Sequence, residues 1–129
     1  MKYILDTHTF IWANTDPNKL STKATKTIID NAPNIYLSAV SIWEMSIKAS
    51  LNNLGFNDIG TFVNQGCKFL NCKVLPILVP HLLRVETLEN FKKHKDPFDR
   101  LIIAQSIITG YPVISIDENF DLYPIKRIW

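Results

Sequence analysis

The segments KYILD at residues 2–6 and PVISID at residues 112–117 carry the clearest indication of the fold class. Each is a short, continuously apolar run that ends at an aspartate, Asp6 in the first and Asp117 in the second. Continuously apolar strands are typical of a parallel sheet that is covered on both faces, because a half-exposed strand alternates apolar and polar residues. We therefore expect two buried parallel strands, each followed by an acid.

Strand-like and helical segments alternate along the rest of the chain. Further strands are expected at residues 35–38, near 74–75 and at 125–128. The expected helices lie at residues 7–14, from 21 until Pro33, and at 39–51, 58–70, 80–91 and 98–108. Leu54-Gly55 is expected to follow the third of these helices as a stop. The pattern predicts an α/β fold, a three-layer sandwich with a central, mainly parallel sheet flanked by helices.

The composition excludes several classes of protein. A chain of 129 residues with 47% hydrophobic and 20% charged residues is typical of one globular domain, here residues 1–129. The net charge of +2 argues against a strongly basic protein that coats nucleic acid. Cys67 and Cys72 are too few for a disulfide framework and are expected to be reduced core thiols.

No apolar run approaches the roughly 18 residues of a membrane span. The short N-terminal apolar run is broken by Asp6 and His8, which is unlike a signal peptide. We therefore expect a cytoplasmic protein that makes no contact with a membrane.

The acids that follow the two buried strands are the first functional candidates. Ligands of parallel sheets bind at the carboxyl ends of the strands, so Asp6 and Asp117 would face one crevice if their strands are neighbours. The alternative is that each acid simply caps the helix that follows it.

Glu44 is the third candidate. On a helical wheel Val40, Trp43, Ile47 and Leu51 share one face, and Glu44 lies at the edge of it. A partly buried glutamate is unfavourable unless something positive meets it. The alternative is a surface ion pair with the lysine four residues further along the chain, Lys48.

Asp99 is the fourth candidate, in the first turn of the helix that begins after Asp96-Pro97. Asp96 already provides the N-cap, so a second acid adds little to the stability of this helix. We therefore interpret Asp96 as structural and Asp99 as functional.

Four converging carboxylates would repel one another and need a counter-charge. Mg²⁺ or Mn²⁺ would supply it, because hard divalent cations prefer carboxylate and water oxygens as ligands. Such an ion lowers the pKa of a bound water and offsets the charge of a phosphodiester, which is the chemistry of metal-assisted hydrolysis.

Four segments of the chain resemble those of PIN-domain ribonucleases, and the similarity is closest to the VapC-type toxins of prokaryotic toxin–antitoxin pairs. The segments are ILDTHTF at residues 4–10, SAVSIWEMSIK at 38–48, DPFDRLIIAQS at 96–106 and ISIDENF at 114–120. Their order matches that of the family, and together they span nearly the whole chain.

The resemblance implies a role for each of these acids. Asp6, Glu44 and Asp99 would form the main metal-ligating group, and Asp117 would act through water or a second ion. All four would be catalytic and bind the metal. Small hydroxyl residues beside the acids would orient carboxylates or water, namely Thr7 and Ser115.

The resemblance also implies the activity and the partners. The expected activity is metal-dependent hydrolysis of RNA phosphodiesters by an endoribonuclease, and the expected partners are RNA, a small antitoxin and a second copy of the chain in a homodimer. Lys48 and Arg100 neighbour the acids and are candidates for holding the RNA backbone, although such cations more often pair with carboxylates. His8 is expected to have a packing or surface role.

Three alternatives stay open. A haloacid-dehalogenase-like phosphatase also places an aspartate at a strand end, but it carries a second acid two residues later, where this chain has His8. A receiver domain would need an aspartate after a central strand, and IYLS at residues 35–38 contains none. A non-catalytic PIN-like interaction module is the third alternative, which the four retained acids argue against.

Overall fold

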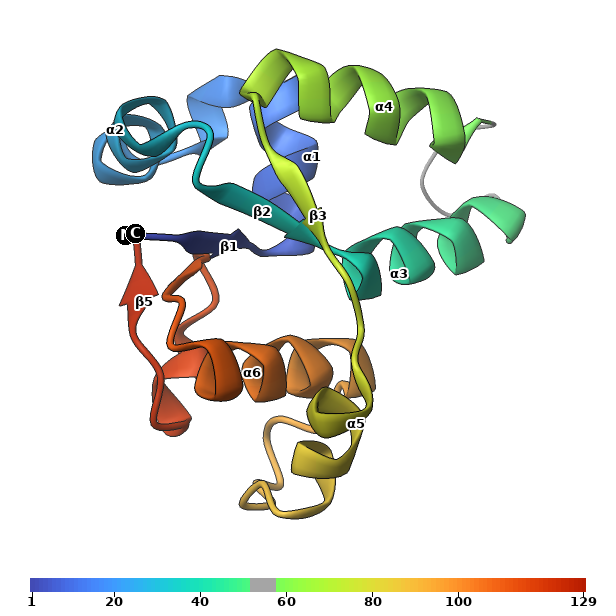
Figure 1. Cartoon of the computed structure of the whole chain (residues 1–129), viewed down its shortest axis with the longest axis vertical. Helices are drawn as coiled ribbons and strands as arrows, with labels where there is room; N and C mark the ends of the chain where they lie inside the picture. Colours follow the sequence, from blue (N-terminus) through green and yellow to red (C-terminus); the bar gives the residue numbers. More distant parts are fainter. Residues whose placement is uncertain (52–57) are drawn as a thin grey trace.

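In the residues that the computed structural model describes, 1–51 and 58–129, five strands form one parallel sheet in the order β3-β2-β1-β4-β5 (Figure 1). The strands are β1 (Tyr3–Leu5), β2 (Ile35–Ser38), β3 (Lys73–Leu75), β4 (Val113–Ile114) and β5 (Arg127–Ile128). This sheet confirms the expected parallel arrangement.

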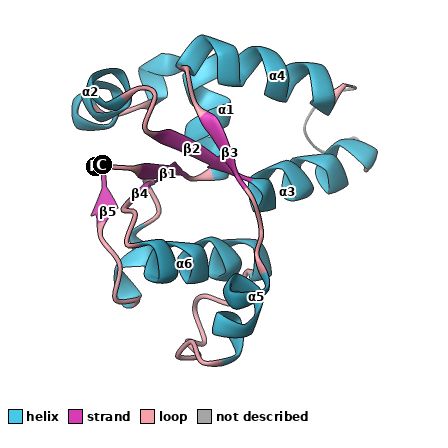
Figure 2. Ribbon diagram, in the orientation of Figure 1, coloured by secondary structure: helices cyan, strands magenta, loops and turns pink. Residues whose placement is uncertain are grey.

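Helices connect the strands and lie on both faces of the sheet (Figure 2). The α-helices are α1 (Thr7–Thr15), α2 (Thr22–Asn31), α3 (Ala39–Ser50), α4 (Ile59–Leu70), α5 (Val79–Glu86) and α6 (Pro97–Thr109). Two 3₁₀ turns, η1 (Pro17–Lys19) and η2 (Glu118–Leu122), complete the described elements. The expected stop at Leu54-Gly55 lies outside the described residues.

The strand expected at 125–128 covers only Arg127–Ile128, and two further elements are also shorter than predicted. The helix expected at 80–91 ends at Glu86, where the N–H and the hydroxyl of Thr87 both donate to the Arg84 carbonyl oxygen, at 3.2 Å and 3.1 Å. The strand expected at 112–116 covers only Val113–Ile114. Beyond it, the Ser115 N–H still donates to the Ile128 carbonyl oxygen at 3.1 Å, and the Ser115 hydroxyl accepts the Asp117 N–H at 3.0 Å.

Successive strand residues point to opposite faces of the sheet, and both faces are buried. Ile4 and Val113 belong to a core that includes residues of α6 and η2. Leu5 and Ile114 belong to a second core, formed with side chains of α1, α2 and α4. Two cores on either side of one sheet make the three layers that the apolar runs predicted.

The helical wheel of α3 led to a wrong buried face. Val40 is buried, but Trp43, Ile47 and Leu51, which were expected to share its buried face, are exposed. The residues buried on α3 are Val40, Ser41, Glu44 and Met45. The helix carries apolar side chains on two sides, so its row of large apolar residues did not mark the core.

The strand order places β1 at the centre of the sheet, between β2 and β4. The chain moves from β1 to one side through β2 and β3 and to the other side through β4 and β5, so the order reverses between β1 and β4. The carboxyl ends of strands at such a switch point form the usual ligand site of an open parallel sheet.

Two smaller expectations concern the cysteines and the membrane. Cys67 and Cys72 are both free and half-buried against the second core. None of the helices described in residues 1–51 and 58–129 has the length and hydropathy needed to cross a membrane.

Candidate metal centre

Asp6 and Asp117 are brought together by the pairing of β1 with β4. Leu5 pairs with Ile114, so Asp6 and Asp117 both follow the carboxyl ends of neighbouring strands. Each acid also caps the element after it: Asp6 Oδ1 accepts the Thr7 N–H at 2.8 Å, and Asp117 Oδ1 accepts the Asn119 N–H at 2.9 Å. Asp6 and Asp117 therefore each cap the element that follows and also lie at the same edge of the sheet.

Glu44 and Asp99 reach the same place from two helices. Glu44 lies in the second turn of α3, which begins directly after β2, and only 5% of its surface is exposed. Asp99 lies in the first turn of α6, whose N-cap is Asp96, as expected. The four predicted acids line one pocket of about 300 Å³ together with His8, Trp12, Lys48, Asp96 and Ile116.

Hydroxyl groups hold the two most buried acids. The Ser115 hydroxyl donates to Asp6 Oδ2 and the Thr7 hydroxyl donates to Glu44 Oε1, both at 2.8 Å. Ser41 Oγ lies 2.8 Å from the Thr7 hydroxyl and fixes it in turn. The hydroxyls therefore sit beside the acids in the positions that the sequence predicted, and they orient carboxylates that are buried.

The local electrostatics disfavour ionised carboxylates. Burial raises the pKa of Asp6. Burial, followed by the charges of Asp6, Asp96, Glu44 and Asp117, raises the pKa of Asp99 to about 8. Because the nearby negative charges contribute to this shift, a cation in the pocket would relieve it.

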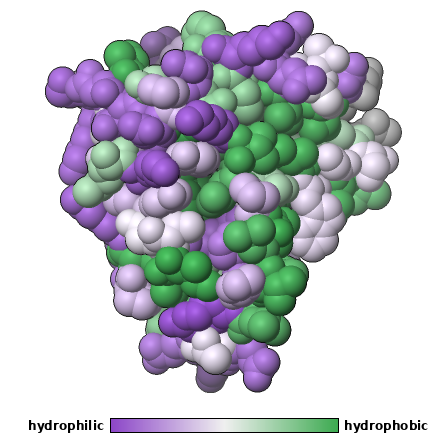
Figure 3. All heavy atoms as spheres, in the orientation of Figure 1, coloured by the Kyte–Doolittle hydropathy of each residue, from purple (hydrophilic) through white to green (hydrophobic). Residues whose placement is uncertain are grey.

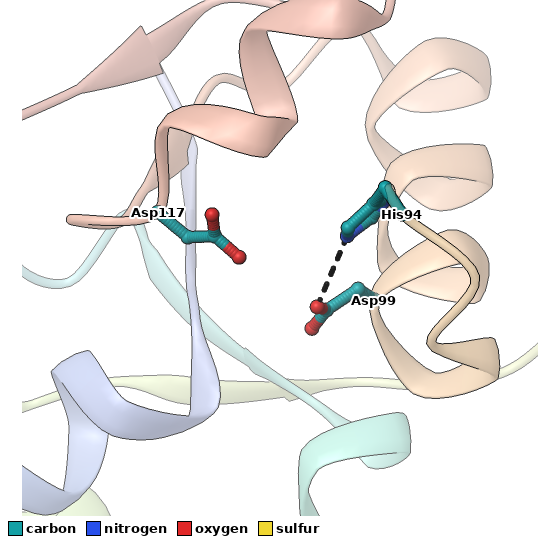
Figure 4. Close-up of side chains that lie close together, drawn as sticks. All are labelled: His94, Asp99 and Asp117. Carbon is teal, nitrogen blue, oxygen red and sulfur yellow. Dashed lines mark hydrogen bonds and ion pairs between the residues drawn. The ribbon is translucent and has the colours of Figure 1, made fainter. Parts of the chain in front are cut away.

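The donor atoms of the pocket fit a divalent cation. His94, Asp99 and Asp117 each offer a ligand atom, and these atoms lie within 4.8 Å of one another (Figure 4). Asp6 and Glu44, which line the same pocket, add further carboxylate oxygens. A group dominated by carboxylates is the donor set that Mg²⁺ and Mn²⁺ prefer.

A family model of the PIN domain matches residues 3–126. The chain belongs to the PIN domain family. Comparison with curated proteins gave no match.

Several solved structures with the same fold are structures of toxin–antitoxin complexes. The PIN domain is similar to a chain of VapBC2 from Rickettsia felis bound to a promoter DNA fragment, with a TM-score of 0.72, 13% identity, and coverage of 98% of this chain and 97% of that one. It is similar to a chain of DNA-bound VapBC from Salmonella typhimurium, with a TM-score of 0.70, 17% identity, and coverage of 98% and 96%. A toxin–antitoxin complex from Klebsiella pneumoniae gives a TM-score of 0.63 at 17% identity, with coverage of 95% and 93%.

The cations that the sequence suggested for RNA are engaged within the PIN domain. Lys48 Nζ lies 2.7 Å from Glu44 Oε2, so the ion pair weighed as an alternative is present. The buried Arg100 donates to the Glu89 carbonyl oxygen, the Tyr123 hydroxyl and Asn90 Oδ1.

His8 and His94 differ in their surroundings. His8 is exposed, and its ring centroid lies 5.8 Å from that of Trp12, which agrees with the expected packing or surface role. Sequence reasoning missed His94, which is buried beside Asp99. No local pattern marks this histidine, because its hydrogen-bond partner Tyr123 lies far along the chain.

Proposed function

We propose that this PIN domain is a metal-dependent endoribonuclease that hydrolyses RNA phosphodiesters. The observation that carries the proposal is one pocket lined by the four predicted acids and by Asp96, with Asp6 and Glu44 buried. Acids grouped in this way destabilise a fold unless a bound cation offsets their charge. Membership of the PIN family supports a nuclease.

Asp6, Glu44, Asp99 and Asp117 would hold the ion, which we propose to be Mg²⁺ or Mn²⁺. The bound ion would supply an activated water and offset negative charge on the phosphodiester. The chain's own contribution is orientation: the Ser115 hydroxyl fixes the Asp6 carboxylate, and the Thr7 hydroxyl fixes that of Glu44. Carboxylates held in this way reorganise little when charge develops during the reaction.

Metal dependence is the first expected result. Purified protein should cleave total cellular RNA in the presence of Mg²⁺ or Mn²⁺, and excess EDTA should abolish the cleavage, because four carboxylates without a counter-ion repel the phosphate. Mapping the ends of the fragments would identify the sites that are cut. Full cleavage after exhaustive chelation would contradict the proposal, and no cleavage with either metal would favour a non-catalytic interaction module.

The cations best placed to hold RNA lie in the segment before α6. Lys92 and Lys95 are exposed and line a hollow of about 430 Å³ with Phe91, His94 and Arg100. His94 also borders the acid pocket, so the hollow and the pocket are neighbours. No ion pair within the described residues engages either lysine, so both are free to bind phosphates.

Neutralising both lysines should weaken RNA binding and lower its dependence on salt. In the double variant Lys92→Gln/Lys95→Gln the slope of log affinity against log salt should fall by about 1.4, or about 0.7 for each lost phosphate contact on a single strand. Fluorescence anisotropy with labelled RNA in EDTA would measure it. Lys26→Gln is the matched control, since Lys26 pairs with Asp30 at 2.7 Å on α2. Equal slopes for all three proteins would argue against this RNA surface.

We further propose that the chain is the toxin of a toxin–antitoxin pair. The complexes that share its fold support this assignment. An apolar groove of about 330 Å³ between α1, α2 and α4 would take an antitoxin segment, and it is lined in part by Leu20, Ile28, Ile29, Phe69 and Leu70. The anionic pocket would accept a basic antitoxin side chain, which would compete with the metal.

The homodimer that we propose would use a different surface. Hydrophobic side chains gather over α3, β3 and α5 (Figure 3), and the exposed ones are Trp43, Ile47, Leu51, Val74, Leu78, Val79, Leu82 and Leu83. Strand β3 is an edge of the sheet, and an exposed apolar edge is unfavourable unless it is covered. A second molecule related by a two-fold axis would cover this surface with the equivalent surface of its own.

Leu83→Asp should dissociate this dimer, because it would place a charge within an apolar contact. Sedimentation velocity should show a dimer for the unmodified protein and a monomer for the variant. Phe69→Asp is the matched control: Phe69 is 74% exposed against 64% for Leu83, but it lines the groove instead. A monomeric unmodified protein, or loss of the dimer in both variants, would contradict the assignment of this surface.

A further inference from the structure

His94 is a buried imidazole with both ring nitrogens engaged. Only 4% of its surface is exposed. Nδ1 lies 2.8 Å from the Tyr123 hydroxyl oxygen, and Nε2 lies 3.2 Å from Asp99 Oδ2. The ring therefore connects the interior of the domain to one of the acids of the pocket (Figure 4).

The partners of Tyr123 indicate which ring nitrogen carries the hydrogen. Arg100 donates from NH1 to the Tyr123 hydroxyl oxygen at 3.0 Å, and a guanidinium group has no acceptor. The Tyr123 hydroxyl is then free to donate its own hydrogen to Nδ1 of His94. A neutral imidazole that accepts at Nδ1 carries its hydrogen on Nε2, which points to Asp99.

Aromatic packing keeps the ring in this orientation. The His94 ring lies 6.0 Å from that of Phe120 at an interplanar angle of 88°, and 5.4 Å from that of Tyr123 at 68°. Phe120 and Tyr123 are both buried. The imidazole is therefore held by two rings as well as by two hydrogen bonds.

We propose that His94 is a positioning residue of the metal centre: the hydrogen-bond chain Arg100–Tyr123–His94 holds the Asp99 carboxylate by its Oδ2 and leaves its Oδ1 for the cation. The proposal rests on the proposed function, since the orientation of Asp99 matters for catalysis only if the pocket binds a metal. Outer partners of this kind fix the geometry of metal-ligating side chains. The competing role is direct ligation of the metal by Nε2, which would require the hydrogen on Nδ1.

The tautomer of His94 distinguishes these two roles in the unmodified protein. Long-range ¹H–¹⁵N NMR spectra of the imidazole, recorded without metal and with saturating Mg²⁺, should show the hydrogen on Nε2 in both states. A hydrogen on Nδ1 in the metal-free protein would overturn the hydrogen-bond chain. A transfer of the hydrogen to Nδ1 when Mg²⁺ binds would overturn the positioning role in favour of ligation.

Metal affinity provides a second readout that does not depend on cleavage. In a titration of Mn²⁺ followed by electron paramagnetic resonance, His94→Leu should bind roughly 10- to 100-fold more weakly. His94→Gln should stay close to the unmodified protein, because its amide nitrogen can take the place of Nε2 as a donor. Equal losses in the two variants, or no loss in either, would overturn the proposal.

Tyr123→Phe tests the chain without altering the histidine. It removes only the hydroxyl, so the Nε2 tautomer should lose its dominance and Mn²⁺ affinity should fall several-fold. Tyr111→Phe is the matched control, because Tyr111 is partly buried against the same core and stacks on Tyr36 outside the hydrogen-bond chain. An unchanged tautomer in Tyr123→Phe would overturn the proposal. Failure of the unmodified protein to bind Mn²⁺ would contradict the metal centre itself. The hydrogen-bond chain through His94 would still be tested by the tautomer in the metal-free protein.

Discussion

Asp6→Asn, Glu44→Gln and Asp99→Asn should each lower RNA cleavage by about 10³-fold, since metal activation contributes several kcal/mol and each 1.4 kcal/mol is tenfold in rate. Each substitution is nearly isosteric and removes one ligating charge. In the absence of metal, Asp6→Asn and Asp99→Asn should be at least as stable as the unmodified protein, because losing a carboxylate relieves repulsion within the pocket, whereas Glu44→Gln also loses the ion pair with Lys48. Cleavage assays with Mn²⁺ and thermal melts in EDTA would measure the two effects separately.

Asp96→Asn is the control for these substitutions. Asp96 lies at the same pocket, but its Oδ1 accepts the Asp99 N–H at 3.0 Å as the N-cap of α6, and asparagine caps helices about as well. Asp96→Asn should lose much less RNA cleavage than the three acid variants. A large fall in melting temperature for all three acid variants would instead show that these acids serve the fold rather than the reaction.

Without metal, Asp99 should make the protein less stable as the pH rises from about 4 to above 8. The pKa of Asp99 is raised from 3.8 to about 8 in the folded protein, chiefly by burial and then by nearby carboxylates. Over this interval the folded state holds a proton that the unfolded state releases, so the free energy of unfolding falls with pH. One such group changes it by at most about 1.4 kcal/mol per pH unit. Burial raises the pKa of Asp6 as well, which adds to the same trend.

Thermal melts in EDTA across this pH range would measure the effect. Asp99→Asn should flatten the dependence and raise the melting temperature near pH 8, and Mg²⁺ should restore stability to the unmodified protein there. Asp30→Asn, which alters an exposed aspartate on α2, is the control and should leave the slope unchanged. The same pH dependence in Asp99→Asn as in the unmodified protein would contradict a pocket of mutually repelling acids.

The sequence predicted the sheet because it depends on local signals, whereas it predicted the convergence of the acids only on the condition that their strands are neighbours. Buried parallel strands appear as apolar runs, and Asp6 and Asp117 follow two of them. That β1 and β4 are neighbours depends on topology, which the sequence pattern did not contain. The wheel of α3 failed because Trp43 is half-exposed and packs on Phe98 of α6, with ring centroids 4.8 Å apart, rather than in either core.

His94 could not be recognised from the sequence because its role depends on residues that only the fold brings near. Tyr123 lies 29 residues further along the chain, and the link between them is a hydrogen bond that no local pattern predicts. Arg100 was considered as a cation for RNA because it neighbours Asp99 in the sequence. In the fold its guanidinium group donates to the Glu89 carbonyl oxygen and the Tyr123 hydroxyl instead.

The most direct test of the account is the position of a bound metal ion. Crystals grown with Mn²⁺ should give an anomalous difference peak inside the pocket, with carboxylate oxygens of at least two of the four acids as its nearest protein atoms, drawn from Asp6, Glu44, Asp99 and Asp117. The same peak should be lost or greatly weakened in Asp99→Asn. No peak in this pocket at saturating Mn²⁺, or a peak held only by residues elsewhere, would contradict the metal centre on which the proposed function depends.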